Sequence, residues 1–295
     1  MNSFIRKTLA LTAAGATALA LIACGDSSDS SSAGLLGSIE SGKVNVGTKF
    51  DQPGLGLRNP DGSFSGLDVD VATYVVNHIA EENNWDTPKI TWRETPSAQR
   101  ETMIKNGEVD LIAATYSINA SRAEAVNFAG PYLITHQALL VRKDDDKISS
   151  LEDLDKGGKL CSVSGSTPAQ KVKDALTGVQ LQEYDTYASC VEALSQGKVD
   201  AVTTDATILY GYAAQYDNQF RVIEMVKPDG KPFTDEYYGI GVKKGDEAST
   251  EAVNTALKEM YSSGEFTKLL KKNLGDDASV VEEGTPGDLS FLTAK

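Results

Sequence analysis

Two stretches of the sequence place hydroxyl groups and a charge directly after an apolar run. The stretch "NGEVDLIAATYSINASR" ends with Thr115, Ser117 and Arg122. The stretch "QGKVDAVTTD" repeats the turn, the Val-Asp step and the hydroxyls, but it ends on Asp205. Hydroxyls and a planar guanidinium suit a carboxylate, and a carboxylate suits an ammonium group. Together the two stretches could bind a zwitterion.

Both charged residues also have a purely structural interpretation. Arg122 could pair with Glu101 or Glu124 at the surface, and Asp205 could cap the helix predicted after it. Opposite charges at equivalent ends of two similar segments favour a shared site over unrelated contacts. We therefore expect Arg122 and Asp205 to face each other across a cleft.

A third hydroxyl-rich segment, "SVSGSTPAQ", contains Ser164, Ser166 and Thr167. It precedes a predicted helix with Pro168 near its first turn. Hydroxyls and the backbone N–H groups at the start of a helix favour an anion. We expect these three residues to contact an anionic group from the other wall of the cleft.

Alternating strand and helix patterns would position these residues. In the first half the expected strands are residues 43–48, 89–94 and 109–115, with helices at 67–83 and 97–105. In the second half the expected strands are residues 159–165, 179–184 and 199–205, with helices at 167–176 and 187–197. This repeated β-α-β-α-β order predicts an α/β fold with mostly parallel sheets flanked by helices.

Two lobes are expected, because 295 residues are enough for two cores. The order of elements predicts lobe 1 at residues 36–138 and 234–273, lobe 2 at 139–233 and a tail at 274–295. Two segments would then cross between the lobes and form a hinge. Ligands of open α/β sheets bind beyond the carboxyl ends of the strands. The hydroxyl-rich segments that follow the predicted strands would therefore line one cleft. Whether the tail docks or is disordered stays open.

The chain resembles the amino-acid-binding proteins of ABC importers, which have a two-lobed, periplasmic-binding-protein-like fold of type II. The resemblance covers residues 36–273 and rests on "VGTKFDQPGLG", "GSFSGLDVDVA", "VDLIAATYSINASRAEAVNFAGPY", "VSGSTPAQ" and "VDAVTTDATIL". It implies that Arg122, Thr115 and Ser117 hold the ligand α-carboxylate and that Asp205 takes the α-ammonium. It also implies that "SGST" adds contacts to the carboxylate from lobe 2.

The resemblance also bears on which amino acid is bound. The segment "TPSAQRE" is similar to one in glutamate and aspartate binders that contributes a serine and an arginine, here Ser97 and Arg100. Lys49 lies where binders of acidic ligands carry another cation, and Tyr187 lies where one branch has a histidine. Two extra cations imply a side-chain carboxylate, with solvated surface charges as the alternative. The pattern most resembles lipid-anchored glutamate-binding proteins of Gram-positive uptake systems, while aspartate and glutamine stay open as ligands.

The N-terminal residues predict export and a lipid anchor. Two basic residues, an apolar run at 9–22 that is too short to span a bilayer, and a cysteine follow one another, as in a signal peptide. The tetrad "LIAC" resembles the lipobox of bacterial lipoproteins, which implies removal of residues 1–23 and lipidation of Cys24. A plain signal peptide is the alternative. Residues 24–35 would form the lipidated end and a flexible tether to the outer face of the cell membrane.

Cys161 and Cys190 are the other two cysteines. In an exported protein such a pair is most simply a disulfide, with two buried free thiols as the alternative. A zinc site is not expected, because neither cysteine has a histidine nearby in the sequence.

Charge and motifs exclude several classes of function. The formal net charge of −14 and the acidic pI argue against nucleic acid or an anionic membrane face as a partner. An enzyme has little support, since the sequence contains two histidines and no G-x-S-x-G, H-E-x-x-H or P-loop pattern. A sensor that reports the same ligand to a receptor is a further alternative. We expect a monomeric binding protein without metal or cofactor, whose partners are L-glutamate or a related acidic amino acid and the permease of an ABC importer.

Overall fold

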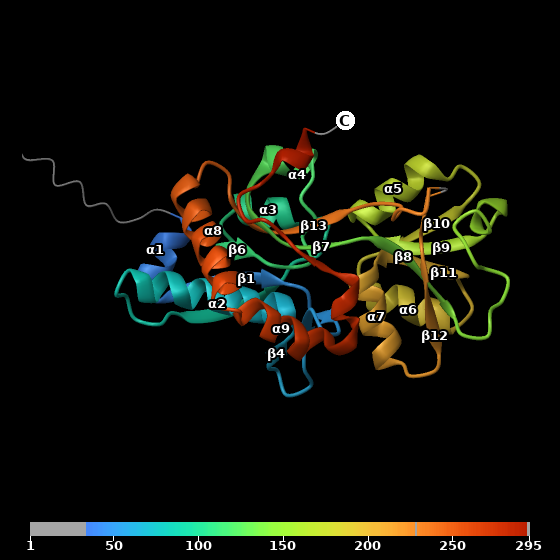
Figure 1. Cartoon of the computed structure of the whole chain (residues 1–295), viewed down its shortest axis with the longest axis horizontal. Coiled ribbons are helices and arrows are strands. Elements are labelled where there is room, and N and C mark those ends of the chain that lie inside the picture. Colours follow the sequence, from blue (N-terminus) through green and yellow to red (C-terminus); the bar gives the residue numbers. More distant parts are fainter. Residues whose placement is uncertain (1–33, 228, 294–295) are drawn as a thin grey trace, which may run out of the picture. The chain divides into compact units, whose positions relative to one another are not determined.

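The computed structural model describes residues 34–227 and 229–293. The predicted signal peptide, Cys24 and nearly all of the predicted tether lie outside the described residues. Two large sheets organise the described chain, and each sheet with the elements packed on it is called a lobe here (Figure 1). No helix among the described residues is long and apolar enough to cross a membrane.

The first lobe is built on a six-stranded sheet in the order β14-β7-β13-β6-β1-β5. Its strands are β1 (Lys43–Thr48), β5 (Lys89–Glu94), β6 (Leu111–Ile112), β7 (Val126–Thr135), β13 (Glu236–Lys243) and β14 (Glu282–Glu283). Its helices are α1 (Leu35–Glu40), α2 (Leu67–Glu82), α3 (Arg100–Lys105), α4 (Ala120–Ala125), α8 (Glu247–Ser262) and α9 (Glu265–Leu274). A small antiparallel sheet lies between β1 and α2 in the sequence and contains β2 (Asp51–Gln52), β3 (Gly56–Arg58) and β4 (Phe64–Ser65).

The second lobe is built on a five-stranded sheet in the order β10-β9-β11-β8-β12. Its strands are β8 (Gln137–Arg142), β9 (Lys159–Val163), β10 (Gln180–Tyr184), β11 (Ala201–Asp205) and β12 (Phe220–Glu224). Its α-helices are α5 (Thr167–Ala175), α6 (Tyr187–Ser195) and α7 (Ala206–Gln215). The second lobe also contains a short 3₁₀ turn, η1 (Leu154–Lys156). Two further 3₁₀ turns, η2 (Gly275–Val280) and η3 (Ser290–Leu292), lie in the C-terminal tail.

The predicted two-lobed α/β fold is confirmed, but both sheets are mixed rather than mostly parallel. In the first lobe β1 pairs in parallel with β5 and β6, whereas β13 pairs antiparallel with β6 and β7. In the second lobe β9 pairs in parallel with β10 and β11, whereas β8 pairs antiparallel with β11 and β12. The antiparallel strands include those that carry the chain between the lobes. The sequence prediction was wrong on this point because the βαβ pattern covers only the parallel part of each sheet, and the antiparallel strands lie outside that pattern.

The first sheet is covered by helices on both faces because its strands alternate between two apolar sets. Leu111 of β6 and Ala129 of β7 share a core with α2 and α8. Their neighbours Ile112 and Phe128 share a second core with Ile104 of α3. Successive side chains of a strand point to opposite faces, so this division places α2 and α8 on one face and α3 on the other (Figure 1).

The strand predicted at residues 109–115 is much shorter in the structure. The carboxylate of Asp110 accepts hydrogen bonds from the Ser38 hydroxyl at 2.7 Å and the Asn45 N–H at 2.7 Å, which replaces part of the ladder. At the other end Thr115 adopts a φ of 47°, outside the β region. The backbone therefore leaves the sheet before the residues predicted to bind a ligand.

The chain leaves the first sheet after Thr135, enters the second at Gln137, and returns between Glu224 and Glu236. The predicted limits of the lobes, at residues 138/139 and 233/234, stay predictions. The tail docks on the first lobe, which the sequence left open. Glu282 of β14 pairs with β7, and the ring of Phe291 stacks on that of Tyr237 with 3.8 Å between ring centres.

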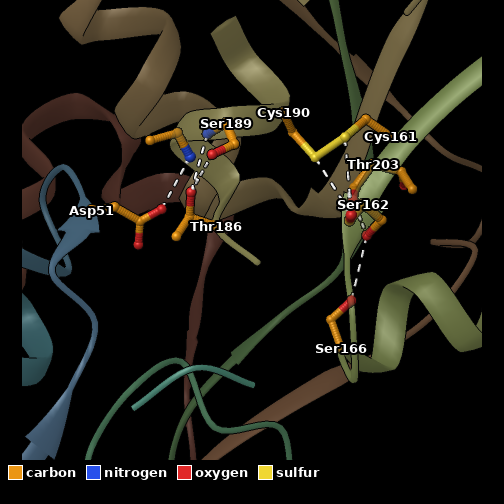
Figure 2. The surroundings of a disulfide bond; sticks show 9 residues. Asp51, Cys161, Ser162, Ser166, Thr186, Ser189, Cys190 and Thr203 are labelled. Atoms are coloured by element: carbon orange, nitrogen blue, oxygen red, sulfur yellow. Dashed lines mark hydrogen bonds between the residues drawn. A yellow bond between two sulfur atoms is a disulfide. The ribbon is translucent and has the colours of Figure 1, made fainter. Parts of the chain in front are cut away.

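The predicted disulfide between Cys161 and Cys190 is present. It joins β9 to α6, so it links the segment before Ser164 to the helix that begins at Tyr187 (Figure 2). Both cysteines are fully buried.

We expect replacement of both cysteines by serine to lower the free energy of unfolding by roughly 3 to 4 kcal/mol, because the bridge restricts the unfolded chain. The sequence separation that it closes is 29 residues. Urea unfolding followed by circular dichroism measures the loss. The unsubstituted protein, unfolded with and without reductant, is the control, and equal midpoints in all three experiments would contradict the prediction.

Candidate functional site

The residues predicted to bind a ligand come from strand ends and helix starts of both lobes. Nine of them are buried, and Ser164 and Thr167 are half-buried. Lys49 follows β1, and Asp205 is the last residue of β11. Thr115 and Ser117 follow β6, with Ser117 bridged to Tyr238 of β13. Parallel strands thus carry much of the predicted site at their carboxyl ends.

Arg122 lies in α4 and bridges the two lobes. Its Nη1 donates to Ser117 O at 2.7 Å, and its Nη2 donates to Gly165 O of the second lobe at 2.9 Å. Its Nε lies 3.5 Å from Glu101 Oε1, so the ion pair considered as an alternative is also present. The side chain is nevertheless buried, unlike an ordinary surface pair. These contacts do not use every N–H group of the guanidinium, so part of the fork can still donate to a carboxylate.

Arg100 is the first residue of α3, and its guanidinium lies close to that of Arg122. Its Nη1 donates to Ala114 O at 2.9 Å. Both guanidiniums lie over the ring of Tyr116, with Cζ to centroid distances of 4.3 Å for Arg100 and 5.2 Å for Arg122. Burial, and next the charge of Arg122, lower the pKa of Arg100 to about 10. Arg100 Nε has no hydrogen-bond partner among the described residues.

Lys49 is the third buried cation, and its Nζ donates to Ser97 Oγ at 3.0 Å. Burial, and next the charge of Arg100, lower the pKa of Lys49 to about 7. We call Lys49, Arg100 and Arg122 the cationic cluster. A lowered pKa means that the surroundings stabilise the positive charge less well than water does. An anion that enters beside the cluster would therefore be bound favourably.

Asp205 provides a buried acceptor in the second lobe. Its Oδ2 accepts a hydrogen bond from the Tyr238 hydroxyl at 2.5 Å, whereas Oδ1 has no partner among the described residues. Burial, and next the charge of Glu236, raise the pKa of Asp205 to about 8. Asp205 occupies the N-cap position of α7, but its side chain makes no capping hydrogen bond, so the alternative role as a cap is not observed. An ammonium group could use Oδ1 and would stabilise the ionised carboxyl.

The remaining second-lobe residues surround the start of α5 and α6. Ser166 caps α5, with its Oγ accepting the Ala169 N–H at 3.2 Å. Thr167 Oγ1 accepts from Asn119 Nδ2 of the first lobe at 3.2 Å. Burial raises the pKa of Tyr187 to about 12, so its hydroxyl keeps its proton and can donate. Figure 2 shows Ser166 below Ser162, and Ser162 belongs to β9, the strand that the disulfide ties to α6.

Thr115 has an unusual backbone, because a φ of 47° is rare for a β-branched residue. Its N–H donates to the buried carboxylate of Asp68 at 2.7 Å. The other oxygen of Asp68 accepts from the Tyr132 hydroxyl at 2.6 Å. Strain of this kind persists where the surroundings hold it in place, and it is frequent at ligand sites. Asp68 therefore positions the backbone around Thr115.

The sequence prediction missed several polar residues that are buried close to the predicted ones along the chain. Both amide atoms of Gln52 and the hydroxyls of Thr48 and Thr204 have no hydrogen-bond partner among the described residues. Thr204 belongs to the hydroxyl-rich exit before Asp205, so the sequence carried a signal for it. Gln52 and Tyr238 carried none, because the burial of Gln52 and the hydrogen bond of Tyr238 with Asp205 arise only in the fold. Buried polar groups without partners in a native fold call for an explanation such as a bound ligand.

A groove of about 800 Å³ runs along the seam between the lobes beside these residues. It is lined from the first lobe by Ser97, Glu101 and Arg122, among others, and from the second lobe by residues 164–167. Among the predicted binding residues that line the groove, Ser164 and Thr167 are the more exposed ones, whereas Ser97, Arg122 and Ser166 are buried.

The described residues offer little for other chemistry. They contain no group of three or more His, Cys, Asp or Glu side chains that could hold a metal ion. The ring of His78 stacks on Tyr74 within α2, and His136 pairs with Glu224. Neither contact resembles a nucleophile and base pair.

Known proteins resemble this chain in sequence and in structure. The model of the bacterial extracellular solute-binding proteins, family 3, matches residues 44–276. The chain is 72% identical to the glutamate-binding protein GluB of Corynebacterium glutamicum over 95% of both chains. It is 39% identical to the ABC transporter glutamine-binding protein GlnH of Bacillus subtilis over 80% of this chain and 82% of that one. The structure of an ancestral arginine-binding protein bound to glutamine aligns with a TM-score of 0.70 and 32% identity, over 80% of this chain and 99% of that one.

Proposed function

The chain belongs to family 3 of the bacterial extracellular solute-binding proteins, and from this premise we propose that it captures L-glutamate outside the cytoplasm and delivers it to an ABC importer. The observation that carries the choice of ligand is the cationic cluster. Three buried cations lie together in a chain whose formal net charge is −14. One carboxylate would leave part of that positive charge uncompensated, whereas glutamate brings two.

In the proposed complex the α-carboxylate binds Arg122 with the hydroxyls of Ser117 and Thr115. The α-ammonium binds the free Oδ1 of Asp205. Arg100 and Lys49, with Ser97, hold the side-chain carboxylate. Ser166 and Tyr187 add hydrogen bonds from the second lobe, with Ser164 and Thr167 at the edge. The ligand would supply what three of these residues lack. Asp205 Oδ1 and Arg100 Nε have no hydrogen-bond partner among the described residues, and burial disfavours the charged forms of Lys49 and Asp205.

The names of the relatives bear on the ligand in opposite directions. The relative at 72% identity is named for glutamate, and one at 39% identity is named for glutamine. Glutamine therefore stands as the second candidate. The cationic cluster favours glutamate, because a carboxamide cannot neutralise a buried cation.

A thermal-shift screen of the amino acids tests the proposal, because a ligand that binds only the folded state raises the melting temperature. Glutamate is expected to give the largest shift and aspartate a smaller one. Neutral and basic amino acids are expected to give little or none. A largest shift with a basic amino acid would overturn the assignment of the cationic cluster.

Capture is proposed to proceed by closure of the lobes around the ligand. Contacts between the lobes, such as those of Arg122 with Gly165 and of Asn119 with Thr167, lie beside the predicted binding residues. A ligand that touches both lobes binds the closed state more tightly and shifts the protein toward it. Small-angle scattering profiles that do not change on addition of ligand would contradict this step.

The lipid anchor is also a proposal. It rests on the "LIAC" tetrad and the apolar run before it, which lie outside the described residues. Lipidation of Cys24 would place the protein at the outer face of the membrane, where an importer can receive the ligand. Mass spectrometry of the mature N-terminal peptide tests it, and an unmodified N-terminus would contradict it.

The proposed selectivity should depend on pH through Lys49. Its pKa of about 7 means that the charge needed for the side-chain carboxylate is lost progressively above that pH in the unliganded protein. We expect the preference for glutamate over glutamine to fall by up to roughly tenfold per pH unit between about pH 7 and pH 8.5. In the Lys49→Met variant the preference should be smaller and independent of pH. Calorimetric titration at several pH values measures it, and a constant preference in the unsubstituted protein would contradict the role of Lys49.

A further inference from the structure

Asp51 of the first lobe reaches across to two helices of the second lobe. Its Oδ2 accepts the backbone N–H of Ala188, in the first turn of α6, at 3.0 Å. The hydroxyl of Tyr212, on α7, lies 2.6 Å from Asp51 O and 3.1 Å from Asp51 Oδ2. Figure 2 shows Asp51 directed at the start of α6, beside Thr186 and Ser189.

Through these contacts the opposite lobe supplies a hydrogen-bond acceptor to the N-terminus of α6. Thr186 caps the helix from within its own lobe by accepting the Ser189 N–H at 3.2 Å. The carboxylate of Asp51 satisfies a second free N–H of the same turn, where a negative charge is favoured. Tyr212 is buried, and burial raises its pKa well above the usual value of 10, so its hydroxyl stays protonated and donates.

Gly211 on α7 allows the backbone of the first lobe to pack closely against this helix. A Cβ atom at this position would lie 2.4 Å from Pro53 O, two residues after Asp51. Gly211 has no left-handed backbone angle that would require glycine. Alanine would also be the better helix former in the interior of α7. The close contact with the first lobe is therefore the structural reason for glycine here.

We propose that Asp51, Gly211 and Tyr212 form an inter-lobe latch that sets the affinity for the ligand by stabilising the closed state. The inference rests on the proposed capture by lobe closure. None of the three belongs to the predicted ligand-binding residues, and their contacts join one lobe to the other. Opening of the lobes at this point would break the hydrogen bonds of Asp51 with Ala188 and Tyr212 and the close packing of Gly211 on Pro53. Because the apparent affinity is the intrinsic affinity multiplied by the fraction of the protein in the binding-competent state, a weaker latch lowers the affinity for every ligand by the same factor.

The Gly211→Ala variant tests the latch. The added methyl group would be forced against Pro53 in the closed state and would destabilise that state, so we expect dissociation constants to rise roughly 5- to 100-fold, through faster dissociation. The same factor should apply to glutamate and to a weaker ligand such as glutamine. The melting temperature of the unliganded protein should stay equal or rise, because alanine favours the helix. A variant that was simply misfolded would instead melt at a lower temperature.

Tyr212→Phe is the second variant, and Tyr210→Phe is its matched control. The Tyr210 hydroxyl, on the same helix, donates to Glu224 within the second lobe at 2.8 Å. Tyr212→Phe should raise the dissociation constants of all ligands by roughly 3- to 10-fold, the effect of one lost hydrogen bond. Tyr210→Phe should leave the dissociation constants unchanged.

Three outcomes decide the matter. Unchanged affinity in Gly211→Ala, or a loss confined to one ligand, overturns the latch. Failure of glutamate to bind the unsubstituted protein overturns the proposed ligand alone, and the latch is then judged on the amino acid that the thermal screen identifies. If no amino acid binds, both proposals fall.

Discussion

Replacing Arg122 with alanine is expected to weaken glutamate binding by roughly 2 to 5 kcal/mol, or about 30-fold to several thousandfold in the dissociation constant. The proposed α-carboxylate would lose its principal partner in a buried site, where no solvent replaces it. The variant also loses the contact of Arg122 Nη2 with Gly165 O across the lobes. Isothermal titration calorimetry measures the change.

Two further variants separate recognition from general effects of charge. Arg58→Ala removes an exposed arginine of the same lobe and should leave the dissociation constant unchanged. Arg122→Lys keeps the charge but not the planar fork, so its affinity should lie between those of the alanine variant and the unsubstituted protein. An unchanged dissociation constant in Arg122→Ala would remove Arg122 from the binding site.

Asp205→Asn is expected to weaken binding by a similar amount, roughly 2 to 5 kcal/mol, because a buried ammonium would lose its counter-charge. The same substitution should stabilise the unliganded protein. The pKa of Asp205 is about 8 in the folded state, against the ordinary value of 3.8. The folded state therefore binds more protons than the unfolded state between these two values, and the Asp205 contribution to stability falls as pH rises through that window.

The asparagine variant lacks this contribution. The substitution should therefore raise the free energy of unfolding, and the gain should be larger at about pH 8 than at about pH 5. Urea titrations without ligand measure this gain. Asp217→Asn, at an exposed position shortly after α7, is the control and should change neither binding nor stability. A variant that binds normally, or that is less stable at the higher pH, would contradict the assigned role of Asp205.

Much of the candidate site could be predicted because hydroxyls and charges follow apolar strands in the sequence. Arg122 and Asp205 come after such runs, and the parallel pairing of β1 with β6 and of β9 with β11 brings the strand ends of each lobe together. The two cysteines could be paired because the third cysteine, Cys24, is predicted to be lipidated. The positions of helices such as α2 could be predicted from the regular spacing of apolar residues. In the structure Val71, Val75 and Ile79 of α2 lie in one core.

Other features depend on contacts that no local pattern encodes. The Tyr238 hydroxyl meets Asp205 only because β13 returns to the first lobe. The left-handed backbone of Thr115 depends on Asp68, which is 47 residues away. For the same reason the antiparallel strands at the crossings were missed, and the docking of the tail was left open. The glycine at 211 could not be distinguished from other glycines until Pro53 was placed against it.

The most direct test of the central claim is calorimetric titration of the unsubstituted protein with glutamate and with glutamine at about pH 7. The two ligands differ only in the group that would meet Arg100 and Lys49. Replacing the carboxylate by a carboxamide leaves buried positive charge uncompensated, a penalty of about 3 kcal/mol. We therefore expect glutamine to bind at least roughly a hundredfold more weakly than glutamate. Equal affinity for the two would contradict the claim that the buried cationic cluster selects an acidic side chain.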